Sequence, residues 1–522
     1  MNRSLHFFNT TGPCNPDRHY MLPPEDRLTG AQLHRYIRDE LYWVLHAPRQ
    51  TGKTTFLQSW MRKINDGNDA VACYVSVERC QGIGDANRAM PGIYHAIRKY
   101  AKDFDVPVPE TDITDTTSIL DDVLHRWAEI VSPKPLIVLF DEVDILEGET
   151  MISFLRQLRG GFASRGIGKF PVSIALVGMR DLKDYITASK DGVAPNPGSP
   201  FNIKENSASL SNFSKEDVAH LFAQRTAENG QLITQEALDY VFEQSGGQPW
   251  IVNSLFKRAT MYLLDEKSVE TVELKHIVEA REQMIMARET HLDALAYRLE
   301  DTGIRDVIEP ILTGESDPDL TKSDSFRLCI DLGLVTLERG TPVIANPIYR
   351  EVIARHLTFG QQSAIPEPEW QWENPDKSLD MDRLLQEFQS FWREHSEIWE
   401  SKTKSNYTEA FPHLLLMAFL QRVLNGGGHI ERDCAAGRGR MDLNIEYNKY
   451  RYIIEIKLLR SYHSPGAFRK KGLEQVRKYR DKFGAKTPTY LIIFDRRPEA
   501  KSKKWEERIS WERDGDVTVL GC

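Results

Sequence analysis

The sequence predicts an α/β chain with two separate sheets, the first of them parallel and the second at the C-terminal end. Three observations predict this fold class. Strand-like and helix-like segments alternate over residues 16–200, which is typical of βαβ units and a parallel sheet. Amphipathic helical segments then follow to about residue 356. Beyond a stretch with three prolines, a strand hairpin, a helix and one more strand complete the chain of 522 residues, long enough for several domains.

The first sheet is predicted from short apolar runs with helical patterns between them. Residues 135–140 are fully apolar, which suits a strand buried on both faces. The other predicted strands are 42–46, 71–77 and 172–177, and the predicted helices are 85–103, 118–131, one from residue 53 and one from residue 149.

The segment A-P-R-Q-T-G-K-T-T, residues 47–55, joins the first of these strands to a helix. It follows the P-loop pattern, with Ala47 where the first glycine usually stands. Lys53 is placed to reach the β- and γ-phosphates of a nucleotide, and the Thr54 hydroxyl is placed to hold Mg²⁺. Successive N–H groups and the helix N-terminus attract the phosphates. The residues predicted to bind ATP here are Gln50, Thr51, Gly52, Lys53, Thr54 and Thr55.

A second signal supports the nucleotide site. The apolar strand ends in Asp141 and Glu142, about ninety residues after the P-loop. This is a Walker B arrangement, in which Asp141 binds Mg²⁺ and Glu142 polarises the attacking water. Paired acids are costly at the end of a buried strand unless they lie at the sheet edge where ligands bind.

Together these segments resemble the AAA-like ATPases of the STAND and archaeal-ATPase type, over roughly the first 355 residues. The resemblance implies that Arg180 is the polar tip of a sensor-1 strand and that Pro249, in G-G-Q-P-W, packs near the adenine. Arg180 as a surface arginine and Pro249 as a simple helix start remain alternatives. The resemblance also implies a winged-helix module and a homo-oligomer. The domains expected are an ATPase core (1–210), a helical lid (211–300), a winged helix (301–357), a linker (358–380) and a C-terminal domain (381–522).

The C-terminal domain contains a second set of functional residues. Residues 437–447 and 451–458 are predicted strands joined by a turn. Asp442 lies on the first strand, and Glu455 and Lys457 lie two apart on the second, so both point to one face. Two carboxylates can hold Mg²⁺ through oxygen ligands, and a lysine can act on water or a scissile phosphate.

These residues resemble the PD-(D/E)XK nuclease superfamily over about residues 404–520, with Asp442, Glu455 and Lys457 as its D…ExK core. Met441 departs from the pattern, because the superfamily's name-giving proline would stand there. The resemblance implies a restriction-endonuclease-like α/β fold, an extra metal-binding carboxylate at Glu409 and a catalytic role for Gln475, four residues before Tyr479. The alternatives are a simple Glu455–Lys457 ion pair, a helix-surface acid at Glu409 and a fold that does not cleave.

Charge and composition bound the partners and the compartment. Residues 375–522 hold 28 basic and 22 acidic residues, a net of +6, and the rest of the chain has a net of −15. A basic C-terminal part favours a nucleic-acid partner, and the superfamily resemblance favours DNA over RNA. No signal peptide or membrane span is recognisable, and the six cysteines show no paired spacing, so a reducing cytoplasm is expected.

The hypothesis is that an ATP-binding and ATP-hydrolysing module controls a Mg²⁺-dependent deoxyribonuclease. The family resemblance suggests a bacterial or archaeal antiviral defence effector. Two alternatives remain open at this point: an ATP-driven DNA-processing or mobile-element enzyme, and a nucleotide-switch sensor whose nuclease fold only binds DNA.

Overall fold

The computed structural model divides the chain into two compact units, residues 1–291 with 326–336, and residues 292–325 with 337–522. It describes residues 6–29, 33–110, 116–165, 168–179, 204–266, 268–287, 290–313, 318–364, 372–402, 415–417, 419–420, 428–436, 439–459, 463–484, 487–495, 497–501 and 503–522. The five-part division expected from the sequence stays a prediction.

The first unit is built on a six-stranded sheet in the order β3-β8-β4-β7-β6-β5. All neighbouring strands run parallel except the edge strand β3, which is antiparallel to β8. Strand β7 therefore lies between β4, which precedes the P-loop, and β6, which ends at Asp141. The strands are β3 (Leu28–Thr29), β4 (Tyr42–His46), β5 (Val71–Ser76), β6 (Leu136–Asp141), β7 (Ser173–Gly178) and β8 (Lys204–Leu210).

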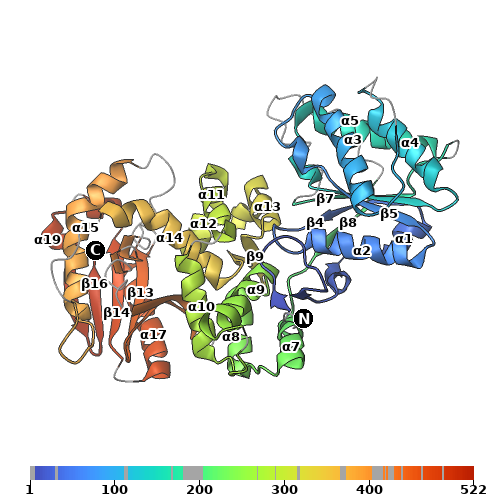
Figure 1. Cartoon of the computed structure of the whole chain (residues 1–522). Coiled ribbons are helices and arrows are strands. Elements are labelled where there is room, and N and C mark those ends of the chain that lie inside the picture. The colour runs from blue at the N-terminus through green and yellow to red at the C-terminus, as the bar shows by residue number, and fades with distance from the viewer. Residues whose placement is uncertain are drawn as a thin grey trace. The chain divides into compact units, whose positions relative to one another are not determined.

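Helices cover both faces of this sheet (Figure 1). One face packs on α3 (Ala86–Asp103), α4 (Ile119–Val131) and α5 (Gly148–Ser164) in a core that includes Trp127 and Phe154. The other face packs on α1 (Leu33–Arg38) and α2 (Lys53–Gly67) in a core around Trp43 and Phe56. Because both faces are covered, the central strands β4, β5, β6 and β7 are mostly apolar, and all six residues of β6 are buried.

A helical extension follows the sheet. Its first helix, α7 (Lys215–Asn229), begins with a capping box in which Ser214 and Asp217 bond each other's backbone N–H groups. The short N-terminal pair β1 (Phe7–Phe8) and β2 (His19–Tyr20) packs against this helical part through Phe8, Phe222 and Phe256. The other helices are α8 (Gln235–Ser245), α9 (Pro249–Lys257), a π-helical turn η4 (Arg258–Leu263), α10 (Leu274–Met286) and α11 (Thr290–Arg298).

Further helices and a β-hairpin follow, and the winged-helix module expected here stays a prediction. These elements are α12 (Thr302–Thr313), a 3₁₀ turn η5 (Pro318–Lys322), α13 (Asp324–Asp331), β9 (Val335–Glu338), β10 (Thr341–Ile344) and α14 (Pro347–Ala364). Three other 3₁₀ turns lie earlier in the chain, η1 (Pro24–Arg27), η2 (Glu78–Cys80) and η3 (Val143–Ile145). Strands β9 and β10 form a two-stranded sheet.

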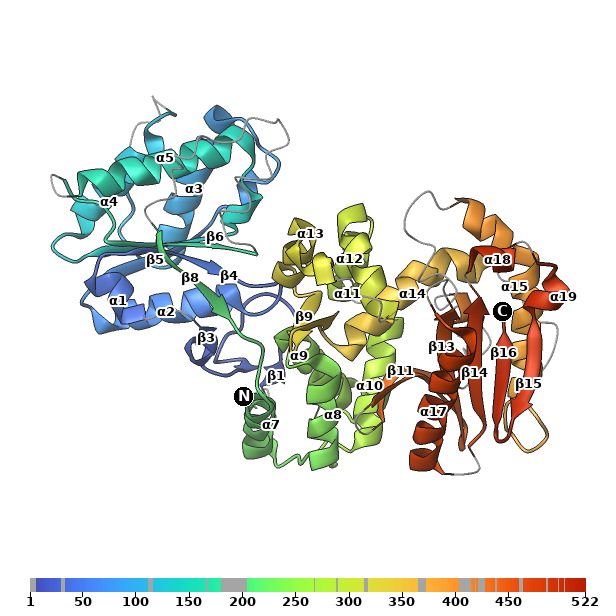
Figure 2. The ribbon, with the colours of Figure 1, turned by 180° about the vertical axis from the view of Figure 1, so that it is seen from behind.

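The C-terminal sheet is mixed, in the order β11-β12-β13-β14-β16-β15. Strands β13, β14 and β16 are parallel, and the remaining neighbours are antiparallel. Figure 2 shows α17 (Pro465–Phe483) beside β13, which it connects to β14. The other elements are α15 (Met381–Lys402), β11 (Gly428–Ala436), β12 (Gly439–Tyr447), β13 (Tyr450–Leu459), β14 (Thr489–Asp495), α18 (Pro498–Lys501), α19 (Trp505–Arg508), β15 (Ser510–Asp514) and β16 (Val517–Gly521).

Three details differ from the sequence predictions. The helix expected to end at residue 356 continues to Ala364 as α14, into the predicted linker. The strand at 489–494 does not close the sheet, because β16 adds beside it and β15 beyond that. Trp372 and Leu379, also inside the predicted linker, are buried in the C-terminal core, where the Tyr452 hydroxyl accepts a 2.7 Å hydrogen bond from the Leu379 N–H.

Within the described residues, no helix is long and apolar enough to cross a membrane. Five cysteines of this part of the chain, Cys14, Cys73, Cys80, Cys329 and Cys522, are free thiols.

Candidate functional sites

The P-loop backbone curls around the start of α2. Gln50 and Gly52 have positive φ angles of 58° and 95°, and Gly52 is the N-cap of the helix. A Cβ on Gly52 would lie 2.9 Å from the Arg27 guanidinium, so this turn requires glycine on two grounds. The Lys53 ammonium donates to the Ala47 and Pro48 carbonyl oxygens at 2.7 and 2.9 Å, at the inner side of the loop. Burial lowers the pKa of Lys53, and nearby carboxylates oppose that shift.

The Walker B residues meet the P-loop at the carboxyl end of β6. Asp141 is buried, and its Oδ2 accepts hydrogen bonds from the Thr54 hydroxyl at 2.7 Å and from the Tyr74 hydroxyl at 3.1 Å. Its Oδ1 accepts the Glu142 N–H at 3.0 Å. Thr54 and Asp141, both predicted to hold Mg²⁺, are therefore in contact, and their oxygens are the hard ligands that this ion takes.

Glu142 has the electrostatics expected of a proton acceptor. It sits in the left-handed region at φ 60°, a conformation uncommon for a non-glycine residue and often found at functional sites. Burial, together with the charges of Asp141 and Asp144, raises the pKa of Glu142 to about 7. A general base is most effective when its pKa lies near the working pH.

A cavity of about 410 Å³ opens at this point, and Glu142 and all six predicted P-loop residues line it. The cavity is large enough for a nucleotide-sized ligand. Its apolar wall, suited to a base, includes Pro13, Leu22, Phe213, Leu221 and Pro249, and the packing of Pro249 near an adenine stays a prediction.

The G-G-Q-P-W turn holds Pro249 in this wall by a close backbone contact. Gly247 has φ 71°, and a Cβ there would meet the Phe213 carbonyl oxygen at 2.0 Å. With glycine at this position the two backbones approach closely, and the Phe213 N–H donates a hydrogen bond to the Gly247 carbonyl at 2.8 Å. Arg180, the other residue implied by the resemblance, lies outside the described residues. Met179, just before it, is held by a 3.0 Å hydrogen bond from its N–H to Asp144.

Sequence reasoning missed the contribution of the N-terminal segment to the cavity. Asn9, Thr10 and Cys14 line it, and the Cys14 N–H donates to the Thr55 hydroxyl at 3.0 Å. The Thr10 carbonyl accepts the Trp250 indole N–H at 2.9 Å. This segment carries no motif, and only the three-dimensional contacts identify it.

Arg27 is a second missed residue. Its buried guanidinium donates to the carbonyls of Thr51 at 2.8 Å and Ser211 at 3.0 Å and lies 4.9 Å above the Phe213 ring. Burial lowers the pKa of Arg27 to about 10. The residue joins the P-loop to the chain entering the helical extension, a role that spacing alone cannot reveal.

In the C-terminal unit, the alternation of β12 and β13 sorts the predicted site residues onto one face. Leu443 pairs with Ile454, and extending this antiparallel register by one residue sets Asp442 opposite Glu455. Directly opposed residues project to the same side of a sheet. Only the backbone position of Asp442 is described, and Glu409 lies outside the described residues, so their metal-binding roles stay predictions. Asn444, two residues after Asp442, is buried.

Glu455 and Lys457 form a close pair on this face. The Lys457 ammonium donates to Glu455 Oε1 at 2.6 Å. The Glu455 side chain is only 1% exposed, whereas that of Lys457 is 20% exposed. The structure therefore shows a Glu455–Lys457 ion pair whose carboxylate is buried, unlike a surface pair that keeps both charges in water, and the catalytic role of the two residues stays a prediction.

Helix α17 covers the same face. Its buried residues Leu473, Val476 and Tyr479 share a core with Ile453, which alternates in phase with Glu455 and Lys457. A Cβ on Gly472 would lie 2.9 Å from Leu491, which pairs with Glu455, so the helix approaches the sheet closely there. Gln475 is one turn further along, and its amide is 3.5 Å from the Tyr479 hydroxyl. Gln475 thus shares the site's face, and its catalytic role stays a prediction.

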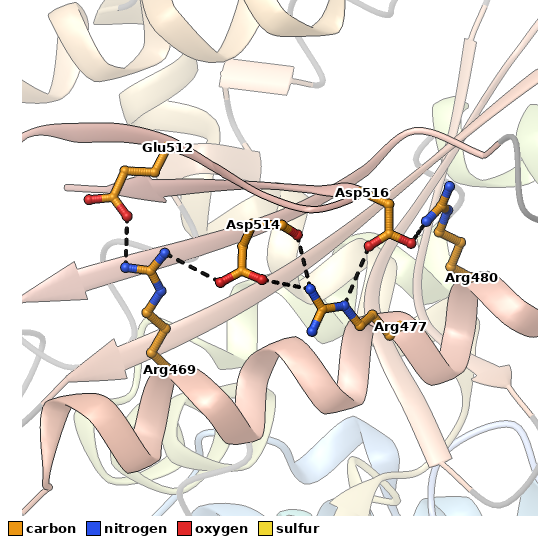
Figure 3. Close-up of polar contacts among 6 residues, drawn as sticks. All are labelled: Arg469, Arg477, Arg480, Glu512, Asp514 and Asp516. Atoms are coloured by element: carbon orange, nitrogen blue, oxygen red, sulfur yellow. Dashed lines mark hydrogen bonds and ion pairs between the residues drawn. The ribbon is translucent and has the colours of Figure 1, made fainter.

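Arginines of α17 are engaged in ion pairs, although the C-terminal part of the chain is basic overall. Figure 3 shows that they pair with three acids of the β15–β16 hairpin, and this set of ion pairs is called the arginine ladder below. It consists of Arg469 with Glu512 and Asp514, Arg477 with Asp514 and Asp516, and Arg480 with Asp516. Lys470, Lys471 and Lys478 are exposed on the same helix and form no ion pair within the described residues, so they are the better candidates for phosphate contacts.

The sequence of this domain also matches a family model. Residues 407–494 match the model described as "PD-(D/E)XK nuclease superfamily". These residues form a PD-(D/E)XK superfamily nuclease domain. The match spans β12, β13, α17 and β14 and covers Asp442, Glu455, Lys457, Gln475 and Glu409. No curated protein matches the sequence.

Several solved structures resemble the N-terminal two-thirds of the chain. The Walker-type ATPase PABY2304 of Pyrococcus abyssi is 14% identical, with a TM-score of 0.47, covering 66% of this chain and 99% of that one. Cdc6p of Pyrobaculum aerophilum is 13% identical, with a TM-score of 0.35, covering 63% of this chain and 91% of that one. The RuvB Holliday junction branch migration motor of Thermotoga maritima is 12% identical, with a TM-score of 0.33, covering 61% of this chain and 90% of that one. The assignment of a P-loop ATPase-like domain rests on the strand order, the P-loop and the Walker B contacts described above.

Proposed function

We propose that this protein is an ATP-regulated, Mg²⁺-dependent nuclease acting on DNA. The observation that supports it most is that one chain carries two sites. The first is a P-loop cavity lined by Thr54 and Glu142, with Asp141 bonded to Thr54, and the second is a nuclease domain in which Lys457 pairs with the buried Glu455. In this proposal, nucleotide binding or hydrolysis in the first domain licenses phosphodiester cleavage by the second.

At the nucleotide site, Lys53 and the P-loop N–H groups would bind the phosphates of ATP, and Thr54 and Asp141 would hold Mg²⁺. The ion supplies charge neutralisation at the phosphates. Glu142 accepts a proton from the attacking water. Pro249 and its apolar neighbours in the cavity exclude water around the base.

At the nuclease site, Asp442 and Glu455 would hold a second Mg²⁺. Lys457 neutralises charge at the phosphate and orients the attacking water. Gln475, on α17, adds its side-chain amide to this set of residues on the same face of the sheet. The basic lysines of this helix would grip the DNA backbone without reading its sequence.

The test is cleavage of plasmid, linear DNA and RNA by the full-length protein with Mg²⁺, with and without ATP. DNA should be cut, and E455Q should lose at least a hundredfold in rate, whereas E446Q, which removes the same charge from the same hairpin, should keep it. K53A should lose the response to ATP, and E142Q should bind ATP and hydrolyse it slowly. Lack of cleavage in every condition would favour the nucleotide-switch sensor, and ATP turnover that depends on DNA would favour a motor.

Two further parts of the proposal come from the resemblance alone. A homo-oligomer is tested by light scattering of the full-length protein with and without ATP. An antiviral role is tested by plating phage on bacteria that express the protein, where protection should be lost in both K53A and E455Q.

A further inference from the structure

The Walker B carboxylate receives one hydrogen bond that the proposed mechanism does not use. Asp141 Oδ2 has two donors, the Thr54 hydroxyl at 2.7 Å and the Tyr74 hydroxyl at 3.1 Å. Thr54 belongs to the P-loop and is itself an expected ligand of Mg²⁺. Tyr74 comes from the neighbouring strand β5, and it does not line the cavity. Asp141 does not line the cavity either, and the Tyr74 hydroxyl bonds its carboxylate from the side of β5.

The Tyr74 side chain is held rigidly. It is buried, and its ring packs edge-on against Tyr100 at 5.2 Å and Phe104 at 6.1 Å between ring centres. Strand β5 is in register with β6, with Ser76 opposite Asp141, so Tyr74 lies two residues earlier on the same side. Burial raises the pKa of Tyr74, so the phenol keeps the proton that it donates.

These contacts restrain both oxygens of the carboxylate. Oδ1 is bound by the Glu142 N–H at 3.0 Å, and Oδ2 by Thr54 and Tyr74. A metal ligand works best when hydrogen bonds from outside the metal's own contacts fix its orientation, and loss of such a bond commonly weakens metal binding ten- to a hundredfold. The Thr54 hydroxyl must serve the carboxylate and the cation together, whereas Tyr74 serves the carboxylate alone.

We propose that Tyr74 is a positioning residue that orients the Asp141 carboxylate for divalent-cation binding at the nucleotide site. This inference rests on the proposed ATP and Mg²⁺ site and adds to it a residue that no sequence motif includes. Tyr74 touches neither the nucleotide phosphates nor the reacting water in this proposal.

The test measures equilibrium binding of a fluorescent ADP analogue to the full-length protein over a range of Mg²⁺ concentrations, with no turnover involved. Y74F removes only the hydroxyl and keeps the ring packing. The Mg²⁺ concentration for half-maximal enhancement of binding should rise about tenfold, whereas affinity measured with the cation chelated should stay unchanged. Y100F is the matched control, because it removes a phenol from the same aromatic cluster and should leave the Mg²⁺ dependence as in the wild type.

A double-mutant comparison separates orientation from packing. In D141N, Y74F should have no further effect on the Mg²⁺ dependence, because the carboxylate that it orients is gone. A wild-type Mg²⁺ dependence in Y74F, an equal effect in the D141N background, or failure of Y74F to fold would each overturn the role of Tyr74. If the wild-type protein bound the analogue without any help from Mg²⁺, the proposed cation site itself would be wrong, which distinguishes the two failures.

Discussion

Replacing Lys457 by methionine should destabilise the nuclease domain, whereas replacing Glu455 by glutamine should not. The side chain of Glu455 is 1% exposed, and its carboxylate lies 2.6 Å from the Lys457 ammonium. Removing one partner of a buried pair typically costs about 3–5 kcal/mol, because the other charge is left without compensation. Lys457 is 20% exposed, so part of its charge is already screened, and we expect a loss of about 2–3 kcal/mol. E455Q leaves the Lys457 ammonium without its counter-charge, but this ammonium can reach water, so the free energy of unfolding should fall by less than about 1 kcal/mol.

Thermal unfolding of the full-length protein measures this asymmetry. Added ATP should raise the unfolding temperature of the ATPase-like domain, because it binds the folded state of that domain. The unfolding transition whose temperature ATP does not change is then that of the nuclease domain. The double variant E455Q/K457M should recover most of the loss, since both charges are absent. Mg²⁺ should also stabilise K457M more than the wild type, because a bound cation returns positive charge beside Glu455. K470M, which removes an exposed lysine of α17, is the control and should change stability by less than about 0.5 kcal/mol. Equal losses in K457M and E455Q would refute the description of Glu455 as a buried, compensated carboxylate.

Three other predictions follow from the contacts. ATP turnover at saturating ATP should rise with pH through a midpoint near 7, because Glu142 must lose its proton to act as a base and its pKa is raised to about 7. D144N removes a neighbouring negative charge, so the midpoint of its pH–rate profile should lie at lower pH. G52A should abolish nucleotide binding in titration calorimetry, since φ 95° is unfavourable for alanine and its Cβ would enter a space that a buried guanidinium fills. R477Q should lower the unfolding temperature and leave DNA affinity unchanged, because Arg477 belongs to the arginine ladder. K478Q should weaken DNA binding and reduce the slope of log affinity against log salt concentration by nearly one. The opposite pattern would contradict the division between the arginine ladder and the exposed lysines.

The central strands were predictable because they are buried on both faces or alternate cleanly. Residues 135–140 were expected as a strand from apolar character alone, and β6 occupies Leu136–Asp141. The turn at residues 448–449 was expected from residue types, and Asn448 indeed has φ 53° between β12 and β13. In both places the sequence signal and the tertiary environment favour the same structure.

The peripheral parts were not predictable, because their signals are weak or shared over long distances. Strand β3 has two residues, and β15 and β16 alternate too briefly to separate from loop sequence. Arg27, Thr10 and Tyr74 reach the nucleotide site from segments with no motif. The basic character of α17 was visible in the sequence, but only the structure shows which of its arginines pair with acids of the hairpin after Trp505.

The segment from Trp372 to Leu379 has a consequence for how such a chain can be assembled by recombination. Its hydrogen bonds run to the β12–β13 hairpin, from the Tyr447 hydroxyl to Glu373 at 3.0 Å and from the Tyr452 hydroxyl to the Leu379 carbonyl at 3.1 Å. The fold of the C-terminal domain therefore includes residues 372–380, and a gene fusion joined at residue 380 would lose these hydrogen bonds and expose part of the C-terminal core.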